Sequence, residues 1–453
     1  AKDSRFTPLH GYLCVKDLTR NYNAGTTGTA TYQVDGTGHL ELAPASGARG
    51  EIVTLSDDVT SFNNVGRNFV FPVAVAVKSF SVKEGTTVGV VQNGVLNGMF
   101  AWCGNLVDCD MTGFDSSNAI SMQHMFMNCY KLENLNISGL NTQNVVSMYQ
   151  MFYNCQSLDN VDFDNFNTAH VGYSGVEPSA ADFAPNIPNA MVQMFEGCSS
   201  ITNIDVSSFV TPYVLQFDRM FYGCSSAKSI DVSGFTTVRA TNFRYMFAEC
   251  SSLTAVDVST FNTKAAYEFS HVFQGCSSLT DVTMPSAFDF SSMKQTYTSA
   301  AEYQYDEESK YPNVGGVAYL FDGCTSMKSV DLSMMVNPTT YFNDFNYMFR
   351  NCWSLVEIIW PEREAFGMDN LVSFHGMFEN CRSMEKISLE FIWDKTGHPD
   401  NAYAMFRGCT NVKEIDLSTF VASTRTTATL RGNYMFANCV NLETVYVNME
   451  WLN

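Results

Sequence analysis

Residues 246–263 read Met-Phe-Ala-Glu-Cys-Ser-Ser-Leu-Thr-Ala-Val-Asp-Val-Ser-Thr-Phe-Asn-Thr, and the same pattern recurs along most of the chain. The first five residues are one copy of a Met-Phe-x-x-Cys signature, in which Phe stands three residues before the cysteine in all twelve copies. Successive cysteines are separated by 26 residues at the shortest and 48 at the longest. A period in this range is typical of a solenoid, in which each repeat forms one coil. The copies end at Cys103, Cys129, Cys155, Cys198, Cys224, Cys250, Cys276, Cys324, Cys352, Cys381, Cys409 and Cys439.

A short strand follows each cysteine. The residues three, six and eight positions after it are apolar in every copy, and positions six and eight share one face of an extended strand. No single coil can bury this apolar face alone, so stability must come from the stacking of neighbouring coils. We therefore predict a β-rich leucine-rich-repeat solenoid of about twelve coils. It has a parallel strand face and short helical or irregular return segments.

The repeated Phe and Cys positions are expected to form a structural spine. The cysteines fit either a ladder of disulfides between adjacent coils or a column of buried thiols, and we favour thiols because stacked side chains point in parallel. The chain has no Cys-x-x-Cys, and its seven histidines are scattered, so we expect neither a metal site nor a cofactor. The spine is represented by Phe126, Cys129, Phe152, Cys155, Phe221, Cys224, Phe247 and Cys250.

The N-terminal part of the chain has a different character. Residues 1–95 contain alternating apolar runs separated by turn dipeptides, which predicts a small all-β domain whose end caps the solenoid. The solenoid then occupies residues 96–453. Two intervals exceed the 26-residue coil by 17 and 22 residues, which predicts insertions near 168–190 and 286–316.

The repeat resembles a known family. The form Met-Phe-x-Gly-Cys-Ser-Ser, followed by Ile-Asp-Val-Ser-x-Phe-x-Thr, is seen at 220–237 and, with small changes, at 246–263. It is similar to the BspA-like leucine-rich repeat, in the variant common in mycoplasma-type surface lipoproteins, and the resemblance covers residues 99–453. What the resemblance implies is a cell-surface or secreted protein that binds other proteins, host surfaces or neighbouring cells. It implies no catalytic residues.

The composition excludes several classes of partner. The 453 residues include 26 basic and 46 acidic side chains, for a formal charge of −20, and the basic residues form no cluster. We therefore expect no nucleic-acid partner, because phosphate affinity is built from clustered Lys and Arg. The longest apolar run, residues 69–77, is too short for a membrane span. The chain opens without a leader, so we expect that any signal peptide has been removed.

An aspartate row is expected along the strands. Seven of the twelve residues that stand seven positions after the cysteine are Asp, and three successive coils carry Asp205, Asp231 and Asp257. Such a row suits Ca²⁺ or a basic partner. The alternative, which we favour, is local: each Asp satisfies backbone donors where its strand ends, together with the Ser two residues later. Calcium also needs six to eight oxygens from a shaped loop.

Binding candidates lie in the insertions and on the C-terminal strands. Tyrosines among acids suit a recognition surface. On the strand face, Ile359 and Tyr446 replace Asp in a region rich in Trp, which suits protein or glycan contact. Alternatively, the Trp side chains pack between less regular coils. The insertion candidates are Tyr173, Tyr297, Tyr303, Tyr305, Asp306, Glu307, Glu308 and Tyr311.

Two function classes follow. Enzymatic signatures are missing, so we expect an adhesin-like interaction protein, extracellular or at the cell surface, that binds a protein or glycan. The alternative is a structural component of a larger assembly, such as a phage fibre, a virion decoration protein or a surface-layer protein. The last strand follows Cys439 without a polar capping segment. We therefore expect that end to contact an assembly partner or a second copy, as in a homo-oligomer.

Overall fold

The computed structural model describes residues 24–27, 29–52, 77–175, 187, 189–292, 316–336, 344–362, 372–389, 399–418 and 432–447. The chain divides into two compact units, Ala1–Phe235 and Thr236–Asn453. Each unit is described by itself.

The first unit begins with a six-stranded sheet. Its order is β1 (Ala24–Thr27), β2 (Ala30–Val34), β3 (His39–Pro44), β5 (Ser79–Val82), β8 (Asp108–Asp110) and β11 (Asn134–Asn136). The first three strands form an antiparallel meander, and from β3 onward each strand pairs in parallel with the next. The strand pairing therefore runs without a break from the N-terminal strands into the first coils. The domain boundary at residue 95 and the capping role stay predictions.

Three smaller sheets complete the first unit. One contains β4 (Arg49–Ile52), β6 (Thr87–Val90) and β9 (Phe114–Asp115), and a second contains β7 (Gly94–Val95) and β10 (Ala119–Ser121). A third joins β12 (Asn203–Asp205) to β13 (Ser229–Asp231). All of these pairs are parallel, as a coil-on-coil arrangement requires.

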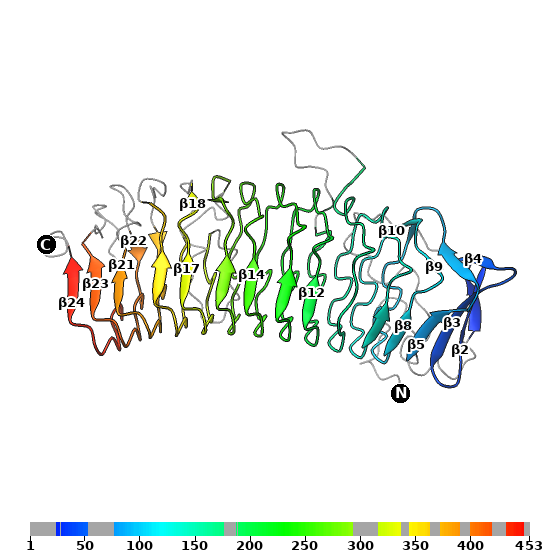
Figure 1. Cartoon of the computed structure of the whole chain (residues 1–453), viewed down its shortest axis with the longest axis horizontal. Coiled ribbons are helices and arrows are strands. Elements are labelled where there is room, and N and C mark those ends of the chain that lie inside the picture. The colour runs from blue at the N-terminus through cyan, green and yellow to red at the C-terminus, as the bar shows by residue number, and fades with distance from the viewer. Residues whose placement is uncertain are drawn as a thin grey trace, which may run out of the picture. The chain divides into compact units, whose positions relative to one another are not determined.

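The second unit repeats the parallel pairing, and Figure 1 shows β14, β17, β21, β23 and β24 in one row. Its pairs are β14 (Ala255–Asp257) with β15 (Asp281–Thr283), β16 (Phe288–Asp289) with β18 (Met335–Val336), β17 (Ser329–Asp331) with β19 (Glu357–Ile359), and β20 (Val372–Ser373) with β22 (Pro399–Asn401). A three-stranded sheet contains β21 (Lys386–Ser388), β23 (Glu414–Leu417) and β24 (Thr444–Val447).

These pairs confirm the predicted solenoid with a parallel strand face. The described residues contain no helix, so the return segments there are turns, short strand pairs and isolated bridges rather than the short helices that were one of the two expected forms. Each repeat strand has only three or four residues. In β12, for example, Ile204 is buried while both flanking residues are exposed, because alternate residues of a strand point to opposite sides.

Two left-handed residues shape each coil. The residue directly before the cysteine has a positive φ in all twelve copies, between 58° and 80°, and so does the residue five before it, between 51° and 66°. L-residues other than Gly, Asn and Asp rarely adopt this conformation. The position before the cysteine is accordingly Gly or Asn in ten copies, and only Trp102 and Glu249 depart from this. The signature therefore encodes a turn as well as a core.

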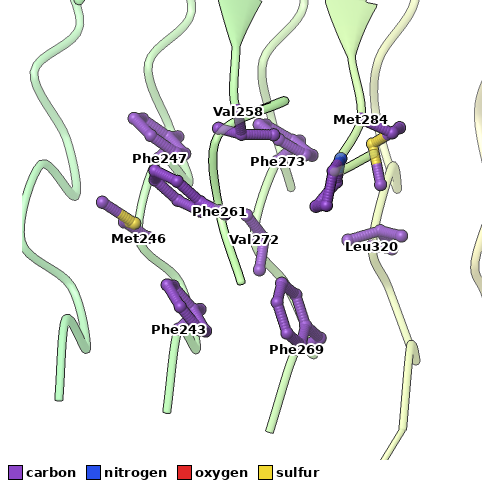
Figure 2. Close-up of a pocket in the computed structure, with 11 residues that line it drawn as sticks. Phe243, Met246, Phe247, Val258, Phe261, Phe269, Val272, Phe273, Met284 and Leu320 are labelled. Atoms are coloured by element: carbon purple, nitrogen blue, oxygen red, sulfur yellow. The ribbon is translucent and has the colours of Figure 1, made fainter. Parts of the chain in front are cut away.

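The core is a column of stacked Phe rings. Within the first unit the rings of Phe126 and Phe152 lie 5.6 Å apart and 3° from parallel. In the second unit the rings of Phe247 and Phe273, both labelled in Figure 2, lie 5.6 Å apart and 6° from parallel. The ring separations exceed the spacing of paired strands by less than about 1 Å, so one ring per coil fills the core.

A small cavity interrupts the core of the second unit. It measures about 10 Å³ and is lined only by apolar side chains, among them Val272 and Leu320 (Figure 2). These two residues stand where the other ten repeats have Met. Val and Leu are shorter than Met, so the Met position of these two coils fills less of the core. The cavity offers no polar group for catalysis.

Candidate interaction surface

The spine cysteines are free thiols. All thirteen described cysteines lack a disulfide, and the eight named spine residues are fully buried. The Sγ of Cys129 donates to the carbonyl oxygen of Phe100, 3.1 Å away in the preceding coil, and Cys352 makes the same bond to Phe321 at 3.1 Å. Burial raises the pKa of the Cys103 thiol to about 12. A thiol held protonated in this way is neither a nucleophile nor a metal ligand.

Within the described ranges, no group of three or more His, Cys, Asp or Glu side chains has the geometry to hold a metal ion. A separate search of those ranges finds no helix that is both long enough and apolar enough to cross a membrane.

The aspartate row makes local bonds. Asp205 and Asp231 are register partners on β12 and β13, and each accepts the backbone N–H of the Ser two residues later, at 3.0 and 2.9 Å. Hydrogen bonds from Ser207 lower the pKa of Asp205; the bond from its hydroxyl has the largest effect, and the bond from its backbone N–H has the next largest. In the second unit, Asp257 accepts the N–H of Ser259 at 2.9 Å. The carboxylates thus satisfy donors where the strands end.

One Ser–His contact escaped the sequence reasoning. His39 on β3 has its Nδ1 2.8 Å from the Oγ of Ser79 and its Nε2 3.1 Å from the Oγ of Ser81, both on β5. A nucleophile and base within this distance are the usual start of a hydrolytic site. Here both ring nitrogens lie within hydrogen-bond distance of serine hydroxyls on neighbouring strands, so the histidine joins β3 to β5.

The outward face of the C-terminal strands carries exposed apolar side chains. Of the eleven large apolar side chains that are exposed in the described residues, seven lie between residues 353 and 447. Ile359 on β19 is 46% exposed and Tyr446 on β24 is 45% exposed. Ion pairs flank them, since Lys386 lies 3.8 Å from Glu414. We call the outward side chains of β19, β21, β23 and β24 the C-terminal strand surface.

A Trp–Arg pair lies at the start of the same coils. Trp353 is 45% exposed, and the guanidinium of Arg382 lies 5.0 Å from the centre of its ring. Ser383 also donates to the Trp353 carbonyl at 2.7 Å, which joins the two coils. By contrast, Trp360 is half-buried and packs edge-on against Phe349 at 6.1 Å. Of the two interpretations of the Trp residues, exposure applies to Trp353 and packing to Trp360.

The second unit also holds a column of stacked Tyr and His rings that sequence reasoning missed. Tyr245 and His271 lie 4.2 Å apart, His271 and Tyr319 4.4 Å, and Tyr319 and Tyr347 4.9 Å. An aromatic residue five positions before the cysteine was the available signal. Because the rings of Tyr245, His271 and Tyr319 stack face to face, these ring faces are covered by one another rather than open to a partner.

The insertion candidates are mostly not placed. Tyr173 is half-buried, with its ring 5.0 Å from that of Tyr213 and 6.1 Å from that of His170. The other seven lie outside the described residues. They are Tyr297, Tyr303, Tyr305, Asp306, Glu307, Glu308 and Tyr311.

The strand ladder, the Phe column and the turn before each cysteine define a leucine-rich-repeat protein. The family described as the BspA type leucine rich repeat region, with six copies, matches residues 317–451. The family described as a Mycoplasma protein of unknown function, DUF285, matches residues 87–184 and 189–311. The breaks between these matches fall within the two insertions. The C-terminal coils therefore match the BspA-type repeat, and the coils before them match the Mycoplasma-type repeat.

Solved structures provide a distant likeness. A leucine rich cell surface protein from Faecalibacterium prausnitzii is 15% identical, with 94% of each chain covered and a TM-score of 0.36. A leucine-rich repeat protein from Bacteroides ovatus is also 15% identical, with 93% of this chain and 94% of that chain covered and a TM-score of 0.35. Comparison with curated proteins gives no match.

Proposed function

We propose that this chain is a non-enzymatic, adhesin-like interaction protein that acts outside the cell or at its surface. Its partner is a protein or a glycan, and the contact is made by the C-terminal strand surface. Leucine-rich-repeat solenoids bind partners through extended faces of this kind. The match of residues 317–451 to the BspA-type repeat supports the extracellular placement.

One observation supports this choice of surface. Ile359 and Tyr446 stand on outward strand positions where other coils of the chain carry Asp, yet about half of each side chain is exposed. Exposed apolar groups rimmed by charges mark interaction sites more often than scattered single residues do. Aromatic and aliphatic anchors of this type supply most of the binding energy of an interface.

The test is capture of surface components by the immobilised full chain. The binding of cell-surface protein extracts and of a glycan array is compared between three proteins: wild type, the double variant Ile359→Ser/Tyr446→Ser and the control Val210→Ser. Val210 is 47% exposed in the first unit, so it matches the exposure but not the location. The double variant should lose more than about tenfold in affinity for each component that wild type retains, while the control loses none. Equal retention by wild type and the double variant contradicts the proposal.

A structural role in a larger assembly is the second candidate. Val440 and Val447, near the C-terminal strands, are 74% and 38% exposed, which suits a contact with another chain. Light scattering across a concentration series separates the two functions. A mass above that of one chain, reduced by Val440→Ser, favours the assembly, and a single-chain mass at all concentrations favours the interaction protein.

A further inference from the structure

A column of polar side chains lies eight residues before the cysteines. In the second unit the side chain of Asn242 accepts the backbone N–H of Arg244 at 2.8 Å, and Asn401 accepts that of Tyr403 at 3.0 Å. Each bond closes the turn that leads into the next Met-Phe pair. A neutral amide is therefore sufficient for this structural role.

Two coils of the same unit carry an acid at this position. Glu268 accepts the N–H of Ser270 at 2.9 Å, and Asp344 accepts that of Asn346 at 2.8 Å. Both acids are buried, with 4% and 1% of their surface exposed. The turn makes the same bond with an amide elsewhere, so the turn itself does not require an ionisable group. A buried carboxyl costs stability when it ionises.

The coil between the two acids has Gly316 at the equivalent position. A Cβ on Gly316 would lie 2.9 Å from the carbonyl oxygen of Asp344 and 3.5 Å from its Cβ, so the glycine packs directly on this residue. No side chain at position 316 separates the two acids. Burial raises the pKa of Asp344 to about 7, Glu268 adds to the rise, and the bond from Asn346 opposes it.

Two cations of the following coils are paired with acids, while the guanidinium of Arg244, in the coil before Glu268, lies 4.9 Å from the centre of the Tyr245 ring. Arg350 makes two bonds to Asp322, at 2.9 and 2.6 Å, and Arg407 lies 2.7 Å from Glu379. In the part of the chain that the structure describes, Asp344 makes no ion pair.

The following coil presents neutral groups to Asp344. Its bridge partner there is Ser373, and His375 stands two residues further on. The His375 Nε2 lies 2.7 Å from the hydroxyl of Tyr347, and burial lowers the pKa of His375 to about 4. Glu268 is thus the charged group that acts on Asp344.

We propose that Asp344 and Glu268 form a proton-sensitive pair, which weakens the packing of the coils around Gly316 when both carboxyls are ionised. The coils pack most tightly in acid, where the pair holds at least one proton. Gly316 is also the last residue of the predicted insertion 286–316. The inference stands apart from the proposed binding surface and does not depend on it.

The direction of the pH effect follows from linkage. The carboxyl of Asp344 has an ordinary pKa of 3.8 in the unfolded chain and a raised one in the folded chain. Its contribution is therefore fully present below about pH 4 and is lost as the pH rises to about 7. In this window the local opening equilibrium should rise by up to about tenfold per pH unit, and it should level off above.

The test is hydrogen exchange of the full chain between pH 4.5 and pH 8.5, corrected for intrinsic exchange and read on peptides from residues 317–336 and 344–362. Asp344→Asn keeps the turn bond that Asn242 and Asn401 make, and it should remove most of the pH slope. The matched control is Asp257→Asn, an exposed carboxylate with the same kind of bond, and it should keep the slope. A slope unchanged in Asp344→Asn, or lost equally in the control, overturns the proposal.

A second variant decides the matter if Asp344→Asn does not fold. Glu268→Gln leaves Asp344 in place and removes the charge that acts on it. The midpoint of the exchange transition should then move to lower pH. An unchanged midpoint in Glu268→Gln overturns the pairing of the two acids.

Discussion

Truncation of one ring in the Phe column tests the account of the core. Phe321 has no exposed surface, and its ring lies between those of Phe273 and Phe349, at 5.5 and 5.7 Å. Phe→Ala at a fully buried site costs about 3–5 kcal/mol, from lost transfer energy and the remaining cavity. Both ring contacts are lost as well, each worth about 0.5–1.5 kcal/mol, so the cost of Phe321→Ala should fall in the upper half of that range.

The assay is urea denaturation of the full chain followed by tryptophan fluorescence and circular dichroism. Wild-type domains are stable by about 5–15 kcal/mol, so this loss removes a large share of the stability of the second unit. Since each coil contacts only its neighbours, the variant should also unfold in two separate steps. Phe321→Leu should lose less than half as much, and Val238→Ala, at an exposed site, should lose almost nothing.

If Phe321→Ala lowers the free energy of unfolding by less than about 2 kcal/mol, the reasoning is refuted, because the Phe column would then contribute little to the stability of the stacked coils. An equal loss in Val238→Ala would also refute it, since that residue is 51% exposed and lies outside the column.

Three further predictions concern single residues. Cys439 is the one cysteine of the described repeats that is only partly buried, so a thiol reagent should label it first in the native chain. Peptide mapping by mass spectrometry measures the order of labelling. Earlier labelling of a fully buried repeat cysteine contradicts this prediction. Gly408→Ala should lower stability by at least about 1–2 kcal/mol in thermal melts, because Gly408 has a φ of +75° and a Cβ would collide with the Asn380 amide; Gly36→Ala, with open space, is the control. Burial lowers the pKa of His375 from 6.5 to about 4, so its contribution to folding stability is present above about pH 6.5 and is lost as the pH falls towards 4. The substitution His375→Gln should therefore reduce the fall of the melting temperature in acid. An unchanged fall contradicts this prediction.

The repeat made the solenoid predictable. Phe and Cys recur at fixed spacing because each coil must place one ring and one small apolar group in the shared core, and alternation over three residues is enough to define a strand. Helical return segments were a wrong alternative in the described residues, because two left-handed residues per coil close the chain into turns. Gly or Asn directly before the cysteine indicated the first turn. The second turn, five residues before the cysteine, could not be predicted because bulky residues such as Tyr347 stand there and rarely adopt a positive φ.

The site was predictable only in part. A break in the aspartate row drew attention to Ile359 and Tyr446, and both are exposed. The acid pair could not be predicted, since Glu268 and Asp344 lie 76 residues apart and are related only through the coil of Gly316 between them. Spacing along a chain reveals such a column only after the turn that precedes each cysteine is known.

The in-register pairing has a consequence for how such a chain varies. In β21 and β23, Lys386, Ile387 and Ser388 pair with Glu414, Ile415 and Asp416 without any shift, and other repeat strands pair in the same way. A junction made by joining one repeat to a non-adjacent one would present the same ring, thiol and strand positions. Genetic recombination between repeats can therefore add or delete whole coils while keeping a packed core, so the length of the solenoid can change without a new fold having to evolve.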